Sequence, residues 1–122
     1  MKQIMFAAAL SLIAFTHAMA DNVSVVGAKA ALNTDGTYSF DVTLLHADTG
    51  WDHYANAWSI IAPDGAVLGT RTLFHPHVDE QPFTRSLSGI KIPAGIKTVT
   101  VVGVDSVHGT DNTSMTVDLP GR

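Results

Sequence analysis

The chain has no cysteine among its 122 residues, and it has few basic residues. Disulfides, thiolate metal sites and cysteine nucleophiles are therefore excluded, although small exported domains often depend on disulfides. The fold must be stabilised by the packing of its core or by a bound ligand. Lysine and arginine together number 7 against 11 acidic residues, and they form no cluster. Without such a cluster to replace phosphate counterions, no nucleic-acid partner is expected.

Long apolar runs are also absent beyond the first twenty residues, and those twenty have the pattern of an export signal. Lys2 supplies the positive start, residues 4–15 are apolar, and residues 18–20 read Ala-Met-Ala, with small residues where signal peptidase cleaves. The apolar run is shorter than the ~20 residues that span a bilayer. A cleavable signal peptide is therefore favoured over a retained N-terminal anchor.

Cleavage after this site defines the domain organisation. We predict a signal peptide over residues 1–20 and a single domain over residues 21–122, with Asp21 as the new N-terminus. No cysteine lies beside the cleavage point, so the sequence has no site for lipid attachment. The expected location is periplasmic or secreted, with no membrane insertion after cleavage.

The remaining sequence has no stretch with helical periodicity and consists of short β-rich runs between turn signals. Asn33–Gly36, Pro63–Gly65 and Pro93–Gly95 have the composition of tight turns. The predicted strands cover residues 23–32, 38–44, 58–61, 67–74, 83–92, 98–104 and 115–119. This pattern predicts an all-β fold, a seven-stranded antiparallel two-sheet sandwich of the immunoglobulin or fibronectin-III type. A small closed β-barrel is the alternative.

Antiparallel alternation brings three connections to one end of the predicted sandwich. These are residues 47–56, 75–82 and 108–112, whereas the three tight turns lie at the opposite end. Of the six histidines, all except His17 fall in or beside the first set of connections: His46, His53, His75, His77 and His108. Loops at one end of a rigid scaffold are where such folds usually build binding sites. The sequence therefore predicts a histidine-rich site at this end.

The sharpest local motif is His75-Pro76-His77. Residues i and i+2 of an extended segment project to the same side, and the proline restricts the backbone between them. Two imidazoles placed in this way can chelate one Zn(II) or Cu(II) ion. The alternative is that the two histidines cap loops and hydrogen-bond to backbone carbonyls.

Two further histidines are candidate ligands. His53 lies in the Trp51–Tyr54 segment, where Asp52 is a candidate to orient it from outside the coordination shell. In the alternative interpretation, Trp51 and Tyr54 plug the open end of the sandwich. His46 shares the parity of the inward-facing residues before it, so it is expected to point inward as an inner ligand or as a core histidine.

Carboxylates near these histidines complete the candidate site. Asp105 ends a predicted central strand and is expected to support a metal-bound His108 or to accept hydrogen bonds from loop amides. Asp79 and Glu80 follow the His-Pro-His motif as candidate ligands or outer-shell groups. The more common role for such a pair is solvation or pairing with an arginine, for which Arg85 is the candidate.

Two longer stretches carry a resemblance. The segments HADTGWDHYA (residues 46–55) and HPHVDEQPFTRSL (residues 75–87) resemble an uncharacterised family of short exported bacterial β-sandwich proteins. The resemblance implies a shared exported domain. It carries no activity, ligand or residue role.

Three functions remain open from the sequence. The first is an exported metal-binding sandwich that holds Cu(II) or Zn(II) through its loop histidines. The second is a metal-free module that contacts a protein or a glycan through Trp51, Tyr54 and Phe74. The third is a small zinc hydrolase that uses a zinc-bound water. His-Glu-x-x-His, Gly-x-Ser-x-Gly and phosphate-binding glycine loops are all absent from the sequence, so catalysis is not expected.

Overall fold

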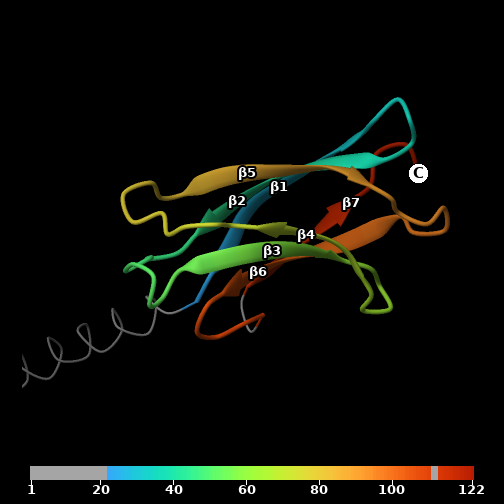
Figure 1. Cartoon of the computed structure of the whole chain (residues 1–122). Coiled ribbons are helices and arrows are strands. Elements are labelled where there is room, and N and C mark those ends of the chain that lie inside the picture. The colour runs from blue at the N-terminus through green and yellow to red at the C-terminus, as the bar shows by residue number, and fades with distance from the viewer. Residues whose placement is uncertain (1–21, 111–112) are drawn as a thin grey trace, which may run out of the picture.

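A computed structural model describes residues 22–110 and 113–122 of the chain. These residues form seven strands (Figure 1). The strands are β1 (Ser24–Leu32), β2 (Tyr38–Leu45), β3 (Ala55–Ile61), β4 (Val67–Thr72), β5 (Phe83–Ile90), β6 (Thr98–Asp105) and β7 (Ser114–Asp118). The predicted signal peptide and Asp21 lie outside the described residues. Within residues 22–110 and 113–122, no helix is long and apolar enough to span a bilayer.

The strands pack as two antiparallel sheets, which confirms the predicted sandwich. One sheet has the order β1-β2-β5 and the other has the order β4-β3-β6-β7. All strand pairs within the sheets are antiparallel. Over the described residues, an isolated parallel bridge between Ser24 and Thr113 joins the two sheets without closing them into one, so the closed-barrel alternative is wrong. The second and fifth strands share one sheet while the third, sixth and seventh share the other, as in immunoglobulin-like sandwiches.

The core lies between the sheets and explains the strand patterns. On β2, Tyr38, Phe40, Val42 and Leu44 are buried, whereas the residues between them are more exposed. Trp58 on β3 is fully buried, which matches the buried tryptophan of the third strand in immunoglobulin-like domains. Alternation therefore places one face of each strand against the opposite sheet.

A glycine on β6 allows the first strand to approach closely. A Cβ atom at Gly103 would lie 2.5 Å from Cγ1 of Val23, which is closer than any side chain tolerates. Val23, which directly precedes β1, is itself fully buried. The absence of a side chain at position 103 is therefore what lets β1 pack over the central strand β6.

One strand differs from its predicted bounds in a way that affects the site. β3 begins at Ala55, three residues before the predicted start at position 58. Ala55 is fully buried and pairs with Asp105 at the end of β6. The sequence Ala-Asn-Ala lacks the β-branched and aromatic residues that mark a strand, so pairing with β6 decides its structure.

The chain alternates between the two ends of the sandwich, as the strand pattern predicts. The β1–β2, β3–β4 and β5–β6 connections lie at one end (Figure 1). The β2–β3, β4–β5 and β6–β7 connections lie at the other end, together with the start of β1. We call this second end the histidine end, because it carries His46, His53, His75, His77 and His108.

Candidate metal centre

His46 follows β2 directly and points into the sandwich, where it is 2 % exposed. Its Nδ1 lies 2.5 Å from Oδ1 of Asp48. An ionised carboxylate only accepts hydrogen bonds, so Nδ1 carries the proton that it donates to Asp48. In the neutral ring, Nε2 then presents its lone pair to the interior.

Asp48 is held in place by three donors. Besides His46, its Oδ1 accepts the backbone N–H of Ala55 at 3.0 Å, and its Oδ2 accepts the backbone N–H of His77 at 2.7 Å. The carboxylate side chain is fully buried. Asp48 thus joins the start of β3 to the β4–β5 loop, and it also orients the His46 ring.

Asp105 ends β6 on the other side of His46, and its side chain is fully buried. Its Oδ1 accepts the backbone N–H groups of Val107 at 2.8 Å and of His108 at 2.5 Å. Burial by itself raises the pKa of the Asp105 carboxyl, but these amides and the His108 imidazole lower it below its ordinary value of 3.8. The carboxylate is therefore ionised at neutral pH.

Two histidine nitrogens converge on this carboxylate. His46 Nε2 lies 3.9 Å from Oδ2 of Asp105, and His53 Nε2 lies 3.6 Å from its Oδ1. One ligand atom from each of the three residues lies within 4.8 Å of the others. Both Nε2 atoms are buried, and neither has a hydrogen-bond partner among the described residues.

This arrangement fits a small metal ion. Two ligand atoms on one tetrahedral ion with 2.0–2.1 Å bonds lie about 3.3 Å apart. The histidine nitrogens lie 3.9 Å from Oδ2 and 3.6 Å from Oδ1 of Asp105, and one ligand atom of each residue lies within 4.8 Å of the others, so the side chains must close inward to share one ion. The donor set of two imidazoles and one carboxylate suits Zn(II), and Cu(II) also binds imidazole strongly. Asp48 supplies the outer carboxylate that metal-bound histidines usually have.

His108 lies at the outer margin of this group. Its Nδ1 is 3.1 Å from Oδ2 of Asp105, and its side chain is 35 % exposed. The rings of His53 and His108 have centroids 5.1 Å apart. His108 therefore lies between the buried group and solvent, within reach of the carboxylate that His46 and His53 share.

His75 and His77 form a separate pair in the β4–β5 loop. Their ring centroids are 4.7 Å apart, so both rings lie on the same side, as an extended segment predicts. His77 is 6 % exposed and stacks on Phe83 at 4.0 Å, whereas His75 is exposed. Burial, followed by the charges of Arg85 and His75, lowers the pKa of His77 below its ordinary value of 6.5. Asp48 and the Gln81 side chain connect this pair to the buried group, because Asp48 accepts the backbone N–H of His77, and Gln81 accepts the backbone N–H of His46 and donates to the His77 carbonyl.

The predicted outer-shell carboxylates have different surroundings. Asp52 and Asp79 are exposed. Glu80 forms an ion pair with Arg85 at 2.9 Å, as its expected pairing with an arginine requires. Asp105, expected in an outer shell, presents an oxygen directly to His46 and His53.

Asp48 contacts the ring of His46, although it is not among the residues predicted for the site. The alternation of inward-facing residues could have identified it, because Asp48 follows His46 by two residues and therefore also points inward. The interpretation of Trp51 as a plug for the open end is wrong, since its side chain is 67 % exposed and packs edge-on against Tyr54.

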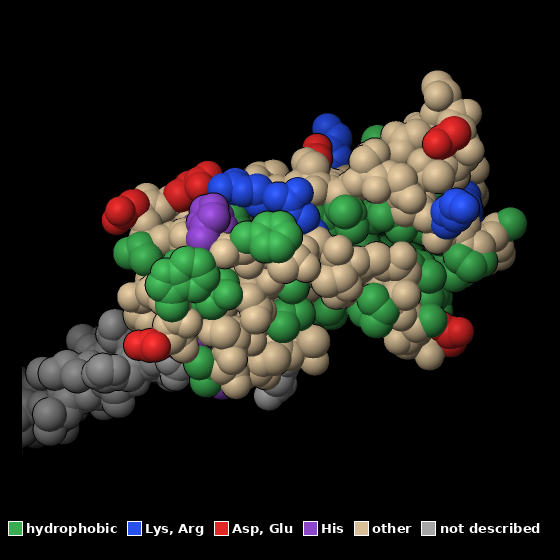
Figure 2. All heavy atoms as spheres, viewed as in Figure 1, with side chains coloured by type: hydrophobic (Ala, Val, Ile, Leu, Met, Phe, Trp, Pro, Cys, Tyr) green, Lys and Arg blue, Asp and Glu red, His purple; other side chains and the backbone are tan. Residues whose placement is uncertain are grey.

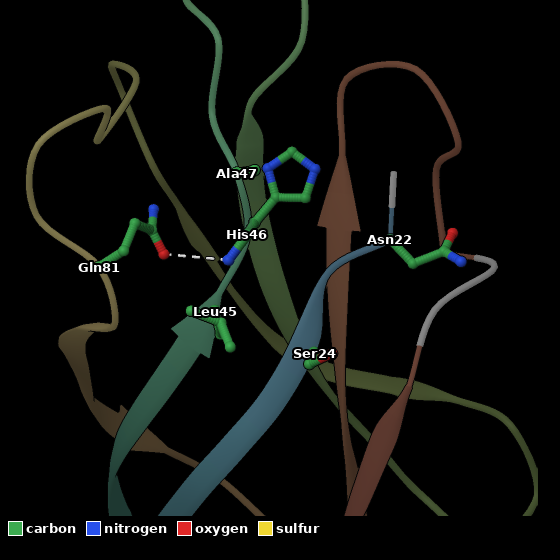
Figure 3. Close-up of a pocket in the computed structure, with 6 residues that line it drawn as sticks. All are labelled: Asn22, Ser24, Leu45, His46, Ala47 and Gln81. Carbon is green, nitrogen blue, oxygen red and sulfur yellow. Dashed lines mark hydrogen bonds between the residues drawn. The ribbon is translucent and has the colours of Figure 1, made fainter. Parts of the chain in front are cut away.

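A cavity of about 420 Å³ lies beside the buried group. Its lining residues are Asn22, Ser24, Leu45, His46, Ala47 and Gln81 (Figure 3). The Gln81 side chain accepts the backbone N–H of His46 at 2.9 Å at the cavity wall. His46 lines this cavity, while its Nε2 is buried.

No family model matches the chain. A protein of Halomicrobium mukohataei described as "Putative lipoprotein" is 44% identical over 79 residues, which is 65% of this chain and 38% of that protein. This chain therefore spans well under half the length of that relative. No solved structure matches.

Proposed function

We propose that the protein is an exported metal-binding domain that holds Cu(II) or Zn(II) between His46, His53 and Asp105. One observation carries the proposal. Two buried imidazole nitrogens without hydrogen-bond partners among the described residues face a buried carboxylate. Buried polar groups are almost always hydrogen-bonded, and buried charges are paired or bind metals. An ion between the three side chains satisfies all of them at once.

The buried carboxylates support a cation at this place. Asp48 and Asp105 have fully buried side chains, and the ion pairs that the described residues form with them come from histidines. His46 uses Nδ1 for Asp48, so its Nε2 is available to an ion without loss of that hydrogen bond. His108 is positioned to add a fourth ligand or to hydrogen-bond to Asp105 from the solvent side.

Export is supported by two observations. Residues 1–20 have the composition of a signal peptide, and the Halomicrobium relative is described as a "Putative lipoprotein", a name used for exported proteins. The 122 residues contain no cysteine to which a lipid could be attached. We therefore extend to this chain the export that the relative's description implies, and we do not extend a lipid anchor.

Thermal unfolding of the untagged protein with and without metal tests the proposal. An ion at a hundredfold excess over its dissociation constant stabilises the native state by about 2.7 kcal/mol. For a domain of this size, we expect the melting temperature to rise by about 10 °C or more with Zn(II) or Cu(II). Fe(II) belongs in the series, because two histidines and one carboxylate also bind that ion.

Variants identify the ligands. His46→Gln or His53→Gln should abolish the stabilisation by Zn(II), whereas Asp52→Asn, in the same loop but exposed, should retain it. An unchanged melting temperature with all three ions at pH 7, or equal stabilisation of His46→Gln and the unaltered protein, would refute the proposal.

A second candidate function is supported by the exposed aromatic residues of the histidine end. Trp51 is 67 % exposed and Phe74 is 76 % exposed. Large hydrophobic side chains and a histidine share the surface of this end (Figure 2). Exposed aromatic residues are typical of protein and glycan interaction surfaces. For a metal-free interaction module, Trp51→Ala and Phe74→Ala would abolish partner binding and the metals would have no effect on stability.

A further inference from the structure

The His75–His77 pair lies outside the buried group, yet its geometry also suits an ion. We propose that His75 and His77 form a second, solvent-facing site that binds Cu(II). This site goes beyond the function proposed above, because it shares no ligand with His46, His53 or Asp105. It can exist whether or not the buried group binds a metal.

The separation of the two rings is the first argument. Two imidazoles bound to one ion at adjacent positions, with 2.0–2.1 Å bonds, have ring centroids about 4.5–5.2 Å apart. The His75 and His77 centroids are 4.7 Å apart, with 38° between the ring planes. The separation of the His75 and His77 rings therefore lies within the range expected of two imidazoles that share an ion.

Available nitrogens are the second argument. His75 Nδ1 lies 3.1 Å from the carbonyl oxygen of Pro76, so Nδ1 carries the proton and Nε2 has the lone pair in the neutral ring. His77 Nδ1 is buried and has no hydrogen-bond partner among the described residues. Each ring thus has a nitrogen that the described protein groups do not use.

The third argument is that the inner ring is fixed before an ion arrives. His77 stacks on Phe83 with 11° between the planes, and its backbone N–H donates to Asp48. The Gln81 side chain donates to the His77 carbonyl at 2.9 Å. His75 is exposed and supplies the route from solvent. A ligand held in advance loses little entropy on binding, which strengthens a site with only two protein ligands.

The donor set selects the metal. The nearby carboxylate of Glu80 is engaged by Arg85, so the site offers imidazole nitrogens and leaves the remaining positions to water. Among divalent first-row ions, Cu(II) binds such ligands most tightly. A site with two imidazoles is therefore expected to retain Cu(II) and to release Zn(II).

Titration of the untagged protein with Cu(II) at pH 7, followed by calorimetry and by electron paramagnetic resonance, tests the inference. We expect two Cu(II) ions per chain. His75→Ala should abolish the solvent-facing site, with at least a tenfold loss of affinity there, and leave the other site unchanged. Val78→Ala, an exposed neighbour of His77 in the same loop, is the matched control and should bind as the unaltered protein does.

The outcomes separate this inference from the proposed function. Loss of one ion in His75→Ala and of the other in His46→Gln supports both. A single ion that is lost in His75→Ala and retained in His46→Gln supports the second site and refutes the buried centre. Unchanged Cu(II) binding in His75→Ala, or loss of all Cu(II) in His46→Gln, overturns the inference.

Discussion

Replacement of Asp48 by asparagine should weaken metal binding without removal of any ligand. The carboxylate accepts the His46 Nδ1–H through Oδ1 and the backbone N–H of His77 through Oδ2. An asparagine side chain has one oxygen, so its amide nitrogen must face one of these donors. Loss of a hydrogen bond to a charged group costs about 1.5–3 kcal/mol.

The effect on the metal is of a different kind. Without the Asp48 carboxylate, no negatively charged acceptor holds the proton of His46 on Nδ1. The tautomer that presents the Nε2 lone pair to an ion is then no longer favoured. Loss of such an outer-shell partner typically lowers metal affinity about 10–100-fold. Competition with a chelator at pH 7 measures the affinity for Zn(II), and denaturant unfolding of the metal-free protein measures the stability separately.

Asp52→Asn is the matched control, because it removes an exposed carboxylate from the same loop. We expect its stability and its affinity for Zn(II) to be unchanged. Asp48→Asn with the Zn(II) affinity of the unaltered protein would show that the Asp48–His46 hydrogen bond does not prepare a ligand, and the reasoning would be wrong.

Three further predictions follow from the fold and the loops. Gly103→Ala should destabilise the protein by about 1–3 kcal/mol in denaturant unfolding, because the added Cβ overlaps the start of β1. Gly95→Ala, with nothing within 4 Å of the added Cβ, should change stability little; equal effects would contradict the packing argument. The His77 imidazole, whose pKa is lowered from 6.5, should titrate below that value in NMR spectra. The contribution of His77 to the stability of the fold is present above pH 6.5 and is lost as the pH falls through its folded pKa. Titration of His77 at or above 6.5 would contradict this prediction. Glu80→Gln should change the unfolding free energy by less than about 1 kcal/mol, because the pair with Arg85 is partly exposed; a larger loss would contradict this.

The fold was predictable because strand patterns record burial directly. Inward parity on β2 continues past the strand to His46, and the alternation of connections places five of the six histidines at one end. The adjacency of His75 and His77 also follows from local geometry, since residues two apart in an extended segment lie on one side.

The grouping of the ligands depends on contacts that no local pattern contains. The pairing of Ala55 with Asp105 places His53 beside the end of β6. The local sequence around Ala55 or Asp105 does not indicate which strand each residue will pair with. Likewise Asp48 meets His77 through a backbone N–H, which any residue type could supply. The sequence therefore predicts which residues are available, and the register between distant strands decides which of them converge.

The most direct test of the metal centre observes the imidazole nitrogens themselves. Nitrogen-15 NMR of the labelled, untagged protein at pH 7 distinguishes protonated, free and metal-bound ring nitrogens. On addition of one equivalent of Zn(II), Nε2 of His46 and Nε2 of His53 should shift to metal-bound values while His46 Nδ1 remains protonated against Asp48. Unshifted resonances of His46 and His53 in the presence of Zn(II) would contradict the buried metal centre.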